Sequence, residues 1–172
     1  GIGFATAKKL LGQGAKVLLI GRTDKNGDLA LAELKEYAGR VKFLRVDLGL
    51  VSQCEELGRV LAKQGEKLDF LVNSAGCYEE KPLAAITEED YNFMLSNNLQ
   101  ATIFLTKALL PLFKENAAIV NVASDAGIQG NYGCPLYSAA KGGIVAFSRS
   151  LALDLAPRIR VNCVCPGDVD TP

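Results

Sequence analysis

Five short apolar runs, separated by segments with helical periodicity, constrain the fold of this chain more than any other sequence feature. The runs are mainly apolar and do not alternate with polar residues as half-buried strands do, which is typical of strands that are buried on both faces. The alternation of such strands with helices indicates a parallel sheet that is covered by helices on both sides. The sequence therefore predicts an α/β fold with a three-layer, doubly wound parallel sheet. The expected strands cover residues 16–20, 41–46, 68–72, 118–123 and 160–164.

Local start and stop signals divide the rest of the chain into helices. Thr87 is a typical N-cap, and acidic residues follow it in the first helical turn. Ser52 and Glu55 match the pattern of a capping box. Asn26-Gly27 is a turn signal, so the helix that follows is expected only from residue 28 onward. The expected helices cover residues 4–11, 28–38, 52–64, 87–110 and 136–156.

The composition limits the classes of function that the chain can have. Its 172 residues suffice for one domain with a core, so residues 1–172 are expected to form a single unit. The formal net charge is zero and no basic run stands out, so we expect neither nucleic acid nor a membrane as a partner. The sequence contains no histidine, which excludes histidine-based triads and zinc sites with histidine ligands. We expect no metal site.

The five cysteines point to a reducing compartment. Their number is odd and no Cys-x-x-Cys motif occurs, so we interpret them as cytoplasmic thiols that serve as small apolar residues. Cys163 and Cys165 lie in an expected strand and should point to the same face.

Small and polar residues follow the expected strands at their carboxyl ends. In open parallel sheets, ligands bind in the crevice beyond these ends. Because all five strand ends carry such groups, a binding crevice is a better explanation than five unrelated turns. The residues concerned are Gly21 and Arg22, Asp47, Asn73 to Gly76, Ser124, and Pro166 with Gly167.

Tyr137 and Lys141 are the best candidates for acid–base chemistry near neutral pH. They are four residues apart in an expected helix and therefore share one face. A free phenol has a pKa near 10, and a nearby cation favours the phenolate. Such a tyrosine can exchange a proton with a substrate oxygen, which the hydroxyl of Ser124 could hold in place. The alternative is a half-buried helix tyrosine without a catalytic role.

Taken together, these motifs resemble those of the short-chain dehydrogenase/reductase family over essentially the whole chain. The turn Gly1-Ile2-Gly3 matches the end of the family's glycine-rich turn, and Tyr137-x-x-x-Lys141 matches its catalytic pair. Asn73-Ser74-Ala75-Gly76 departs mildly from the family's usual Asn-Asn-Ala-Gly. The remaining matches are Asp47-Leu48, Ser124 and Pro166-Gly167-x-x-x-Thr171.

The resemblance implies hydride exchange between a nicotinamide cofactor and a carbonyl or secondary alcohol. It implies a catalytic tetrad of Asn98, Ser124, Tyr137 and Lys141, with Tyr137 as general acid or base. Asn98 would kink its helix and hold a water molecule in the proton relay. Two alternatives stay open: a non-catalytic NAD(P)-binding regulatory protein, and an epimerase or dehydratase on the same scaffold.

The resemblance also implies the residues that bind the cofactor. Members that prefer NAD place an acid where this chain has Gly21, and Arg22 can meet a 2′-phosphate, so NADP (as NADPH) is favoured over NAD. The implied cofactor-binding residues are Gly1, Ile2, Gly3, Arg22, Asp47, Leu48, Asn73, Ala75, Gly76, Tyr137, Lys141, Pro166, Gly167, Val169 and Thr171.

Both ends of the chain differ from the family pattern. The family begins with a strand that precedes the glycine turn, and it continues beyond Thr171 into a segment that covers the substrate. We therefore expect an internal fragment with an incomplete dinucleotide-binding domain. The family's first strand lies in the middle of its sheet, so we expect a gap between the strands at 16–20 and 68–72, or a rearranged sheet. The resemblance further implies a homotetramer formed through the helices at 87–110 and 136–156, and a small-molecule carbonyl or alcohol as substrate.

Overall fold

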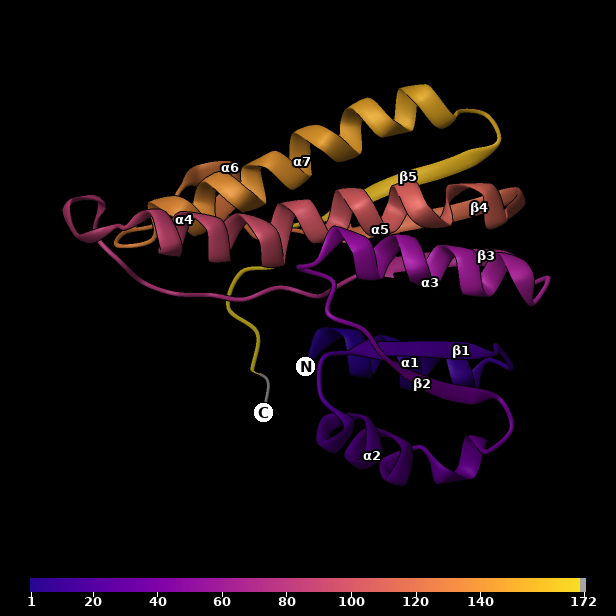
Figure 1. The fold of residues 1–172 in the computed structure, drawn as a ribbon. Coiled ribbons are helices and arrows are strands. Elements are labelled where there is room, and N and C mark those ends of the chain that lie inside the picture. The colour runs from indigo at the N-terminus through magenta and orange to yellow at the C-terminus, as the bar shows by residue number, and fades with distance from the viewer. Residues whose placement is uncertain (171–172) are drawn as a thin grey trace.

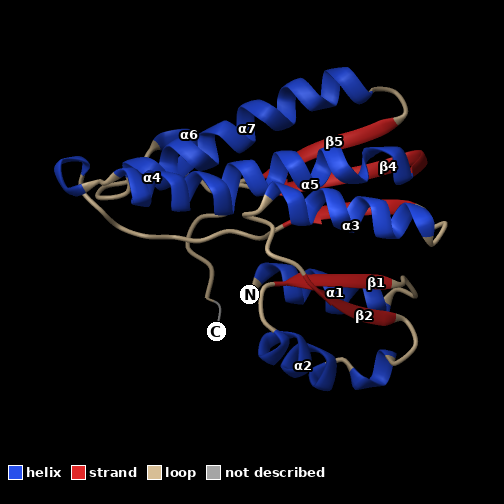
Figure 2. Ribbon diagram, viewed as in Figure 1, coloured by secondary structure: helices blue, strands red, loops and turns tan. Residues whose placement is uncertain are grey.

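Parallel strands and covering helices build the molecule, as the sequence predicts (Figures 1 and 2). The structure is a computed structural model and describes residues 1–170. The strands are β1 (Val17–Gly21), β2 (Val41–Arg45), β3 (Leu68–Asn73), β4 (Phe113–Val122) and β5 (Ile159–Val164). The α-helices are α1 (Ile2–Gly12), α2 (Asp24–Glu33), α3 (Val51–Lys63), α4 (Glu88–Leu95), α5 (Ala101–Leu109), α6 (Ala126–Gln129) and α7 (Pro135–Leu155).

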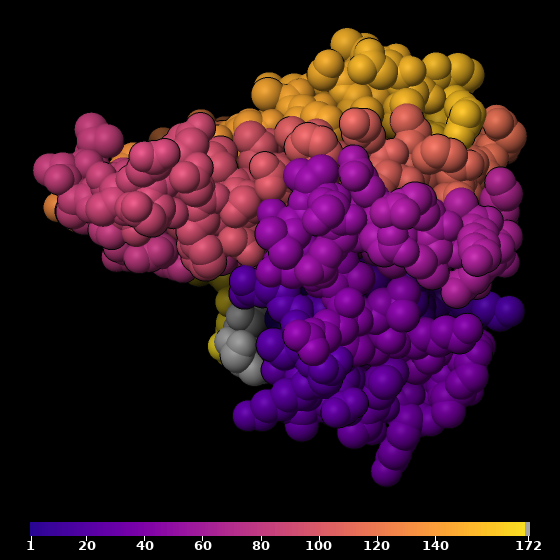
Figure 3. Space-filling view, in the orientation of Figure 1, coloured from indigo at the N-terminus to yellow at the C-terminus, as the bar shows by residue number. Residues whose placement is uncertain are grey.

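Within residues 1–170 the strands form two sheets. β1 pairs in parallel with β2, and β3, β4 and β5 form a parallel three-stranded sheet with β4 in the centre. No ladder joins β1 to β3 in the part of the chain that is described, so the expected gap between these two strands is confirmed. Figure 1 shows the two-stranded sheet beside the β3 edge of the larger one. On the face seen in Figure 3, the atoms of the N-terminal part adjoin those of the α3 region.

The main hydrophobic core lies between the three-stranded sheet and the helices α3 and α5. Ile119 in the central strand is fully buried, and Leu57 of α3 and Leu105 of α5 are nearly so. From the smaller sheet, Leu18 and Ile20 pack against this cluster but stay only half-buried. The smaller sheet is thus attached through side chains and not through main-chain hydrogen bonds.

The expected starts of α2 and α3 are wrong, and both errors have a local cause; α1 also begins earlier than expected, at Ile2. α2 begins at Asp24 and not at residue 28, because the Thr23 hydroxyl caps it by accepting a hydrogen bond from the main-chain N–H of Asn26 at 3.4 Å. Gly27 therefore lies inside the helix, and no turn forms there. At α3 the expected capping box of Ser52 is absent, because the helix begins one residue earlier and Leu50 occupies the N-cap.

The capping box at Thr87 is present, with Asp90 as its reciprocal partner. The long helix that follows is not continuous. A π-helical turn, Ser96–Gln100, separates α4 from α5 and contains the fully buried Asn98. The interruption expected at Asn98 is therefore confirmed. None of the helices within residues 1–170 combines the length and the apolar character that crossing a bilayer requires.

Candidate active site

Tyr137 and Lys141 lie on one face of α7, one turn apart, as their spacing predicts. The Nζ atom of Lys141 is 5.6 Å from the centre of the Tyr137 ring, within the range of a cation–π contact. α7 begins at Pro135, which suits a first helical turn, so Tyr137 lies close to the start of the helix. The helix thereby holds an ammonium group beside the phenol.

Lys141 is almost completely buried. Its Nζ donates a hydrogen bond to the carbonyl oxygen of Val122 at 3.2 Å. Burial lowers the pKa of Lys141, while the neighbouring Cys77, Cys163 and Cys165 act in the opposite direction. A buried ammonium with one hydrogen bond retains donor capacity for a further partner, because the group carries three N–H bonds.

Ser124 lies just beyond the end of β4, where the sequence places it. Its hydroxyl donates to Oδ1 of Asp125 at 3.0 Å and accepts from the main-chain N–H of Ala126 at 3.2 Å. No hydrogen bond joins Ser124 to Tyr137 among the described residues. The short helix α6 follows Ser124 and packs tightly on α7, since a Cβ atom at Gly127 would lie 2.6 Å from the carbonyl carbon of Lys141.

Asn98 and Lys141 meet at Gly76. A Cβ atom at Gly76 would lie 2.6 Å from Oδ1 of Asn98 and 3.3 Å from Nζ of Lys141. The Asn98 amide donates to the carbonyl oxygens of Met94, at 3.0 Å, and Cys77, at 3.1 Å. It also accepts from the main-chain N–H of Cys77 at 3.3 Å. Only a glycine at position 76 lets the loop after β3 pass between these two side chains.

Asn73 lies at the end of β3, but its side chain faces the interior. Its amide donates to Oγ1 of Thr106 at 3.0 Å and to Oδ1 of Asn121 at 2.8 Å, and Asn121 in turn donates to Ser148 at 2.8 Å. This buried network ties β3 to β4, α5 and α7. The sequence analysis did not identify Thr106, Asn121 or Ser148, because only the pairing of the strands brings them together.

The glycine turn at the start of the chain lies against the same loop. Gly1 is the N-cap of α1, and no acidic residue occupies the first turn of this helix. A Cβ atom at Gly3 would lie 3.3 Å from the side chain of Ser74. Ala75 is exposed beside it. A helix N-terminus of this kind favours a phosphate group, which suits the pyrophosphate of a dinucleotide.

Arg22 lies beyond the end of β1 and reaches the π-helical turn. Its Nη1 donates to Oδ1 of Asn97 at 3.2 Å. A Cβ atom at Gly49 would lie 3.4 Å from the same oxygen, and the Gly49 N–H donates to Oδ1 of Asp47 at 3.0 Å. Leu48, between Asp47 and Gly49, packs at the edge of the main core. The structure thus groups Arg22, Asp47 and Asn97, of which the sequence analysis missed Asn97.

The segment after β5 lies against Ser124. The carbonyl oxygen of Pro166 accepts a hydrogen bond from the N–H of Asp125 at 2.9 Å, and a Cβ atom at Gly167 would lie 3.3 Å from Oδ2 of Asp125. Val169 is half exposed. Thr171, the last predicted cofactor residue, lies outside the described residues.

Tyr78 is an aromatic neighbour of the site that the sequence analysis did not identify. Its ring meets that of Tyr137 edge-on, with the ring centres 4.9 Å apart. Its hydroxyl donates to Glu80 at 2.5 Å, and this bond is the main reason why the pKa of Tyr78 is raised to about 12. No local sequence signal indicates that the loop between β3 and α4 folds back onto α7.

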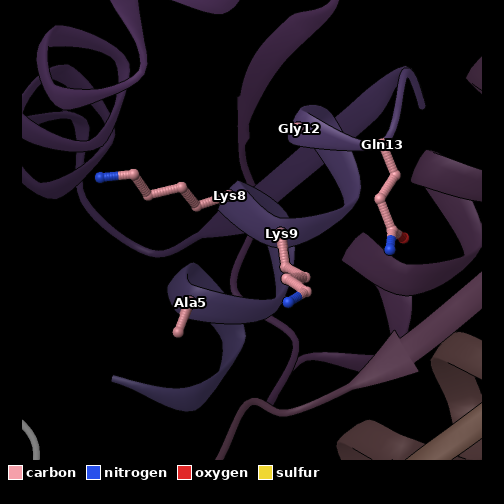
Figure 4. Close-up of a pocket in the computed structure, with 5 residues that line it drawn as sticks. All are labelled: Ala5, Lys8, Lys9, Gly12 and Gln13. Carbon is pink, nitrogen blue, oxygen red and sulfur yellow. The ribbon is translucent and has the colours of Figure 1, made fainter.

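A shallow hollow lies on α1, away from these side chains (Figure 4). It has a volume of about 570 Å³ and is lined by Ala5, Lys8, Lys9, Gly12 and Gln13. It contains no member of the predicted tetrad. We therefore place the candidate site at the carboxyl ends of β3, β4 and β5, where the hydrogen bonds and close approaches converge.

The fold and this arrangement define the class to which the protein belongs. The chain is a member of the short-chain dehydrogenase family, whose sequence profile matches residues 1–172. Rossmann-type members of this family share its fold, with TM-scores of about 0.9. The family is one of oxidoreductases.

Individual relatives include enzymes with several different substrates. The chain is 33% identical to the 3-oxoacyl-(acyl-carrier-protein) reductase FabG of Chlamydia pneumoniae, with 99% of this chain and 70% of the relative covered. It is also 33% identical to a cyclopentanol dehydrogenase of Comamonas testosteroni, with 100% and 70% covered. Among solved structures, a variant of the actinorhodin polyketide ketoreductase with NADPH superimposes with a TM-score of 0.91 at 32% identity, covering 100% of this chain and 68% of the other.

Proposed function

We propose that this protein is an NAD(P)-dependent reductase that transfers hydride to a carbonyl group, or from a secondary alcohol in the reverse direction. One observation carries the proposal: a buried ammonium, Lys141, lies beside the phenol of Tyr137 and borders the same glycine as Asn98. A structural helix tyrosine does not need a buried cation beside it. Burying that cation costs free energy, and a catalytic role gives a reason why the protein keeps it buried there.

The residues present suit a nicotinamide dinucleotide. The uncapped N-terminus of α1 suits the pyrophosphate, Arg22 the 2′-phosphate, and Lys141 the nicotinamide ribose. When bound, the cofactor supplies or accepts the hydride. We propose NADP over NAD, because Arg22 is a cation at the strand end where an acid would select NAD.

Each member of the tetrad has one proposed role in reduction. Tyr137 donates the phenolic proton to the carbonyl oxygen, and the charge of Lys141 lowers the cost of the phenolate that remains. Ser124 turns its hydroxyl from Asp125 to the substrate oxygen. Asn98, whose amide is fixed by Met94 and Cys77, holds the water through which the phenolate regains a proton.

Replacing Tyr137 by Phe tests this proposal. The change removes the proton donor but keeps the ring and its contact with Tyr78. In the whole protein we expect turnover to fall at least about a hundredfold, the usual scale of acid–base catalysis, while NADPH affinity changes little. Tyr132→Phe is the matched control, since Tyr132 is 98% exposed, and it should leave turnover unchanged.

Normal turnover in the Phe variant would refute the assignment of Tyr137. An inactive wild type that still binds NADPH would favour a regulatory binding protein. Product analysis separates a reductase from an epimerase or dehydratase. By their names, the relatives act on substrates as different as 3-oxoacyl-(acyl-carrier-protein) and cyclopentanol, so a panel of carbonyl compounds is required.

We further propose that residues 1–172 belong to one dinucleotide-binding domain in a cytoplasmic homotetramer. Apolar side chains on α4 and α7 support a subunit interface there, since Tyr91, Phe93 and Leu153 are large and exposed. All five cysteines are free thiols, as expected in a reducing compartment. Sedimentation of the whole protein at micromolar concentration tests the assembly, and a monomer would contradict it.

A further inference from the structure

Cys163 and Cys165 form a close pair of thiols at the end of β5. Their sulfur atoms are 4.0 Å apart, a contact in which either thiol can donate a hydrogen bond to the other, and this confirms that both point to the same face of the strand. They pack against Ala123 and against Ile144 and Val145 of α7, and both remain partly accessible. Neither residue has a role in the proposed chemistry.

The spacing of the two sulfurs suits a bridging ion better than a disulfide. Two residues in a strand span about 6.6 Å between Cα atoms, close to the upper limit of about 6.8 Å for a disulfide. A tetrahedral metal with metal–sulfur bonds of about 2.3 Å holds two sulfurs about 3.8 Å apart. The observed 4.0 Å is therefore close to the separation that such a metal requires.

The surroundings of the pair keep Cys165 protonated unless a cation replaces the proton. Burial raises the pKa of Cys165, and the neighbouring Cys163 raises it further, so two thiolates without a cation are unfavourable here. The main-chain N–H of Ser124 and the charge of Arg149 act in the opposite direction, as donors to a thiolate would. A divalent ion that replaces both thiol protons would leave a neutral group beside the ammonium of Lys141.

We propose that Cys163 and Cys165 form an open two-thiolate site for one soft divalent cation, Zn²⁺ or Cd²⁺. Two metal–sulfur bonds form, and the two thiol protons leave to the solvent. Within residues 1–170 no cluster of three or more His, Cys, Asp or Glu side chains is arranged to hold a metal. Water or another small ligand therefore completes the coordination, which distinguishes this site from closed structural zinc sites. The proposal does not depend on the proposed enzymatic function.

The position of the site links it to Ser124. The carbonyl oxygens of Val164 and Pro166 accept hydrogen bonds from Ala123 at 2.8 Å and from Asp125 at 2.9 Å. The segment with the two thiols is thus hydrogen-bonded to the residues on both sides of Ser124. A bound cation would restrain this segment at the point where the proposed serine must turn its hydroxyl.

A cadmium titration of the whole protein tests the site. The protein is reduced with a phosphine, freed of metal and titrated with CdCl₂, while the ultraviolet charge-transfer absorbance of cadmium–thiolate bonds is followed. We expect the absorbance to reach a plateau at one Cd²⁺ per chain, with two protons released per ion. Zn²⁺ should displace Cd²⁺ and remove the absorbance.

Three variants identify the ligands. Cys163→Ser and Cys165→Ser should each abolish the stoichiometric plateau. Cys77→Ser, which removes another thiol near Lys141, should retain it. If circular dichroism shows that Cys163→Ser does not fold, Cys163→Val is used in its place. Cys165→Ala likewise takes the place of Cys165→Ser, and both substitutions keep the environment apolar. A plateau that persists without both thiols, or a wild type with no cadmium–thiolate absorbance at one equivalent, would overturn the proposal.

Discussion

The two sheets of this molecule have the same parallel pairing but differ in how deeply they are buried. In the central strand of the larger sheet, Ile119 and Asn121 are fully buried. In β1 of the smaller sheet, all five residues are only half-buried. The larger sheet carries Ser124 and supports α7 with Tyr137 and Lys141, whereas the smaller sheet carries Arg22. The proposed proton chemistry thus lies on the better packed part, and the proposed cofactor selection on the less packed part.

The difference shows what a parallel sheet needs for stability. Parallel strands are stable when they are paired on both sides and covered on both faces. β1 and β3 each have one edge that no described strand pairs with. Regions with few buried contacts open locally at low free energy, so we expect the smaller sheet to open before the larger one.

The largest expected effect concerns residues 1–172 expressed alone. Unpaired main-chain groups along β1 and β3 cost roughly 1–3 kcal/mol each when buried, against a total stability of about 5–15 kcal/mol. We expect this chain to be poorly folded or aggregated and to bind no cofactor. Thermal melting and NADPH titration measure this. A monomer that melts cooperatively and binds NADPH would show that the two open edges cost little.

A second expected effect concerns the choice of cofactor by the smaller sheet. Arg22→Asp replaces a charge-assisted partner of the 2′-phosphate with a repulsive acid, so NADPH affinity in the whole protein should fall by about ten- to a hundredfold. NADH affinity should change little. Lys42→Asp, the same charge change on the neighbouring strand β2, is the control. An unchanged ratio of NADPH to NADH affinity would make Arg22 an ordinary surface charge.

Two glycine-to-alanine changes compare the packing of the two regions directly. A Cβ atom at Gly58 of α3 would lie 2.6 Å from the main-chain oxygen of Ala108, which cannot move alone. Gly58→Ala should destabilise the whole protein by about 1–3 kcal/mol. At Gly27 of α2 the clash is with the ring of Phe43, at 2.3 Å, in the less packed region. The Phe43 side chain must turn to admit this Cβ atom, which costs less than moving the Ala108 main chain, and alanine favours the helix, so Gly27→Ala should cost less than Gly58→Ala. Denaturant unfolding of both variants measures the difference, and an equal or larger cost at Gly27 would contradict it.

The smallest expected effect is a change in how stability depends on pH. Burial lowers the pKa of Lys141 below its value in the unfolded chain. At pH values between these two pKa values, the unfolded chain binds more protons at Lys141 than the folded chain does. The free energy of unfolding therefore rises with pH in this range. Lys141→Met should remove this rise, which denaturant midpoints measured from neutral pH to about 10.5 would show. A parallel pH dependence in the two proteins would indicate that Lys141 is not desolvated.

The sequence was sufficient to predict those helices and strands for which the apolar pattern and the start and stop signals agree. All five strands lie close to their predicted positions, because apolar runs bounded by glycine and polar residues exclude most alternatives. β4 is the least accurate, since it begins at Phe113 and passes through charged residues that break the apolar pattern. At α2 two local signals competed, and Thr23 prevailed over Asn26-Gly27 because a capped helix also buries Gly27 against Phe43.

For the candidate site, the sequence predicted residues that the fold brings close together, but not the contacts that fix them. The spacing of Tyr137 and Lys141 was enough to place both on one face of a helix. The edge-on contact of Tyr78 and the bond from Arg22 to Asn97 depend on how loops and a second sheet approach. Such contacts join residues more than fifty positions apart, and no local pattern encodes them.

The π-helical turn, Ser96–Gln100, has a consequence for deletions and insertions in this helix. Its wide turn adds a residue, and the Asn98 amide bonds to the Met94 carbonyl group from within the helix. Removing one residue here would restore regular α-helical bonding. Because the wide turn already absorbs the extra residue, α5 would keep roughly its orientation relative to α4, and Leu105 and Leu109 would stay in the core. The hydrogen bonds from the Asn98 amide to Cys77 and Met94 depend on the wide turn, so this deletion would spare the core and disturb the candidate site instead.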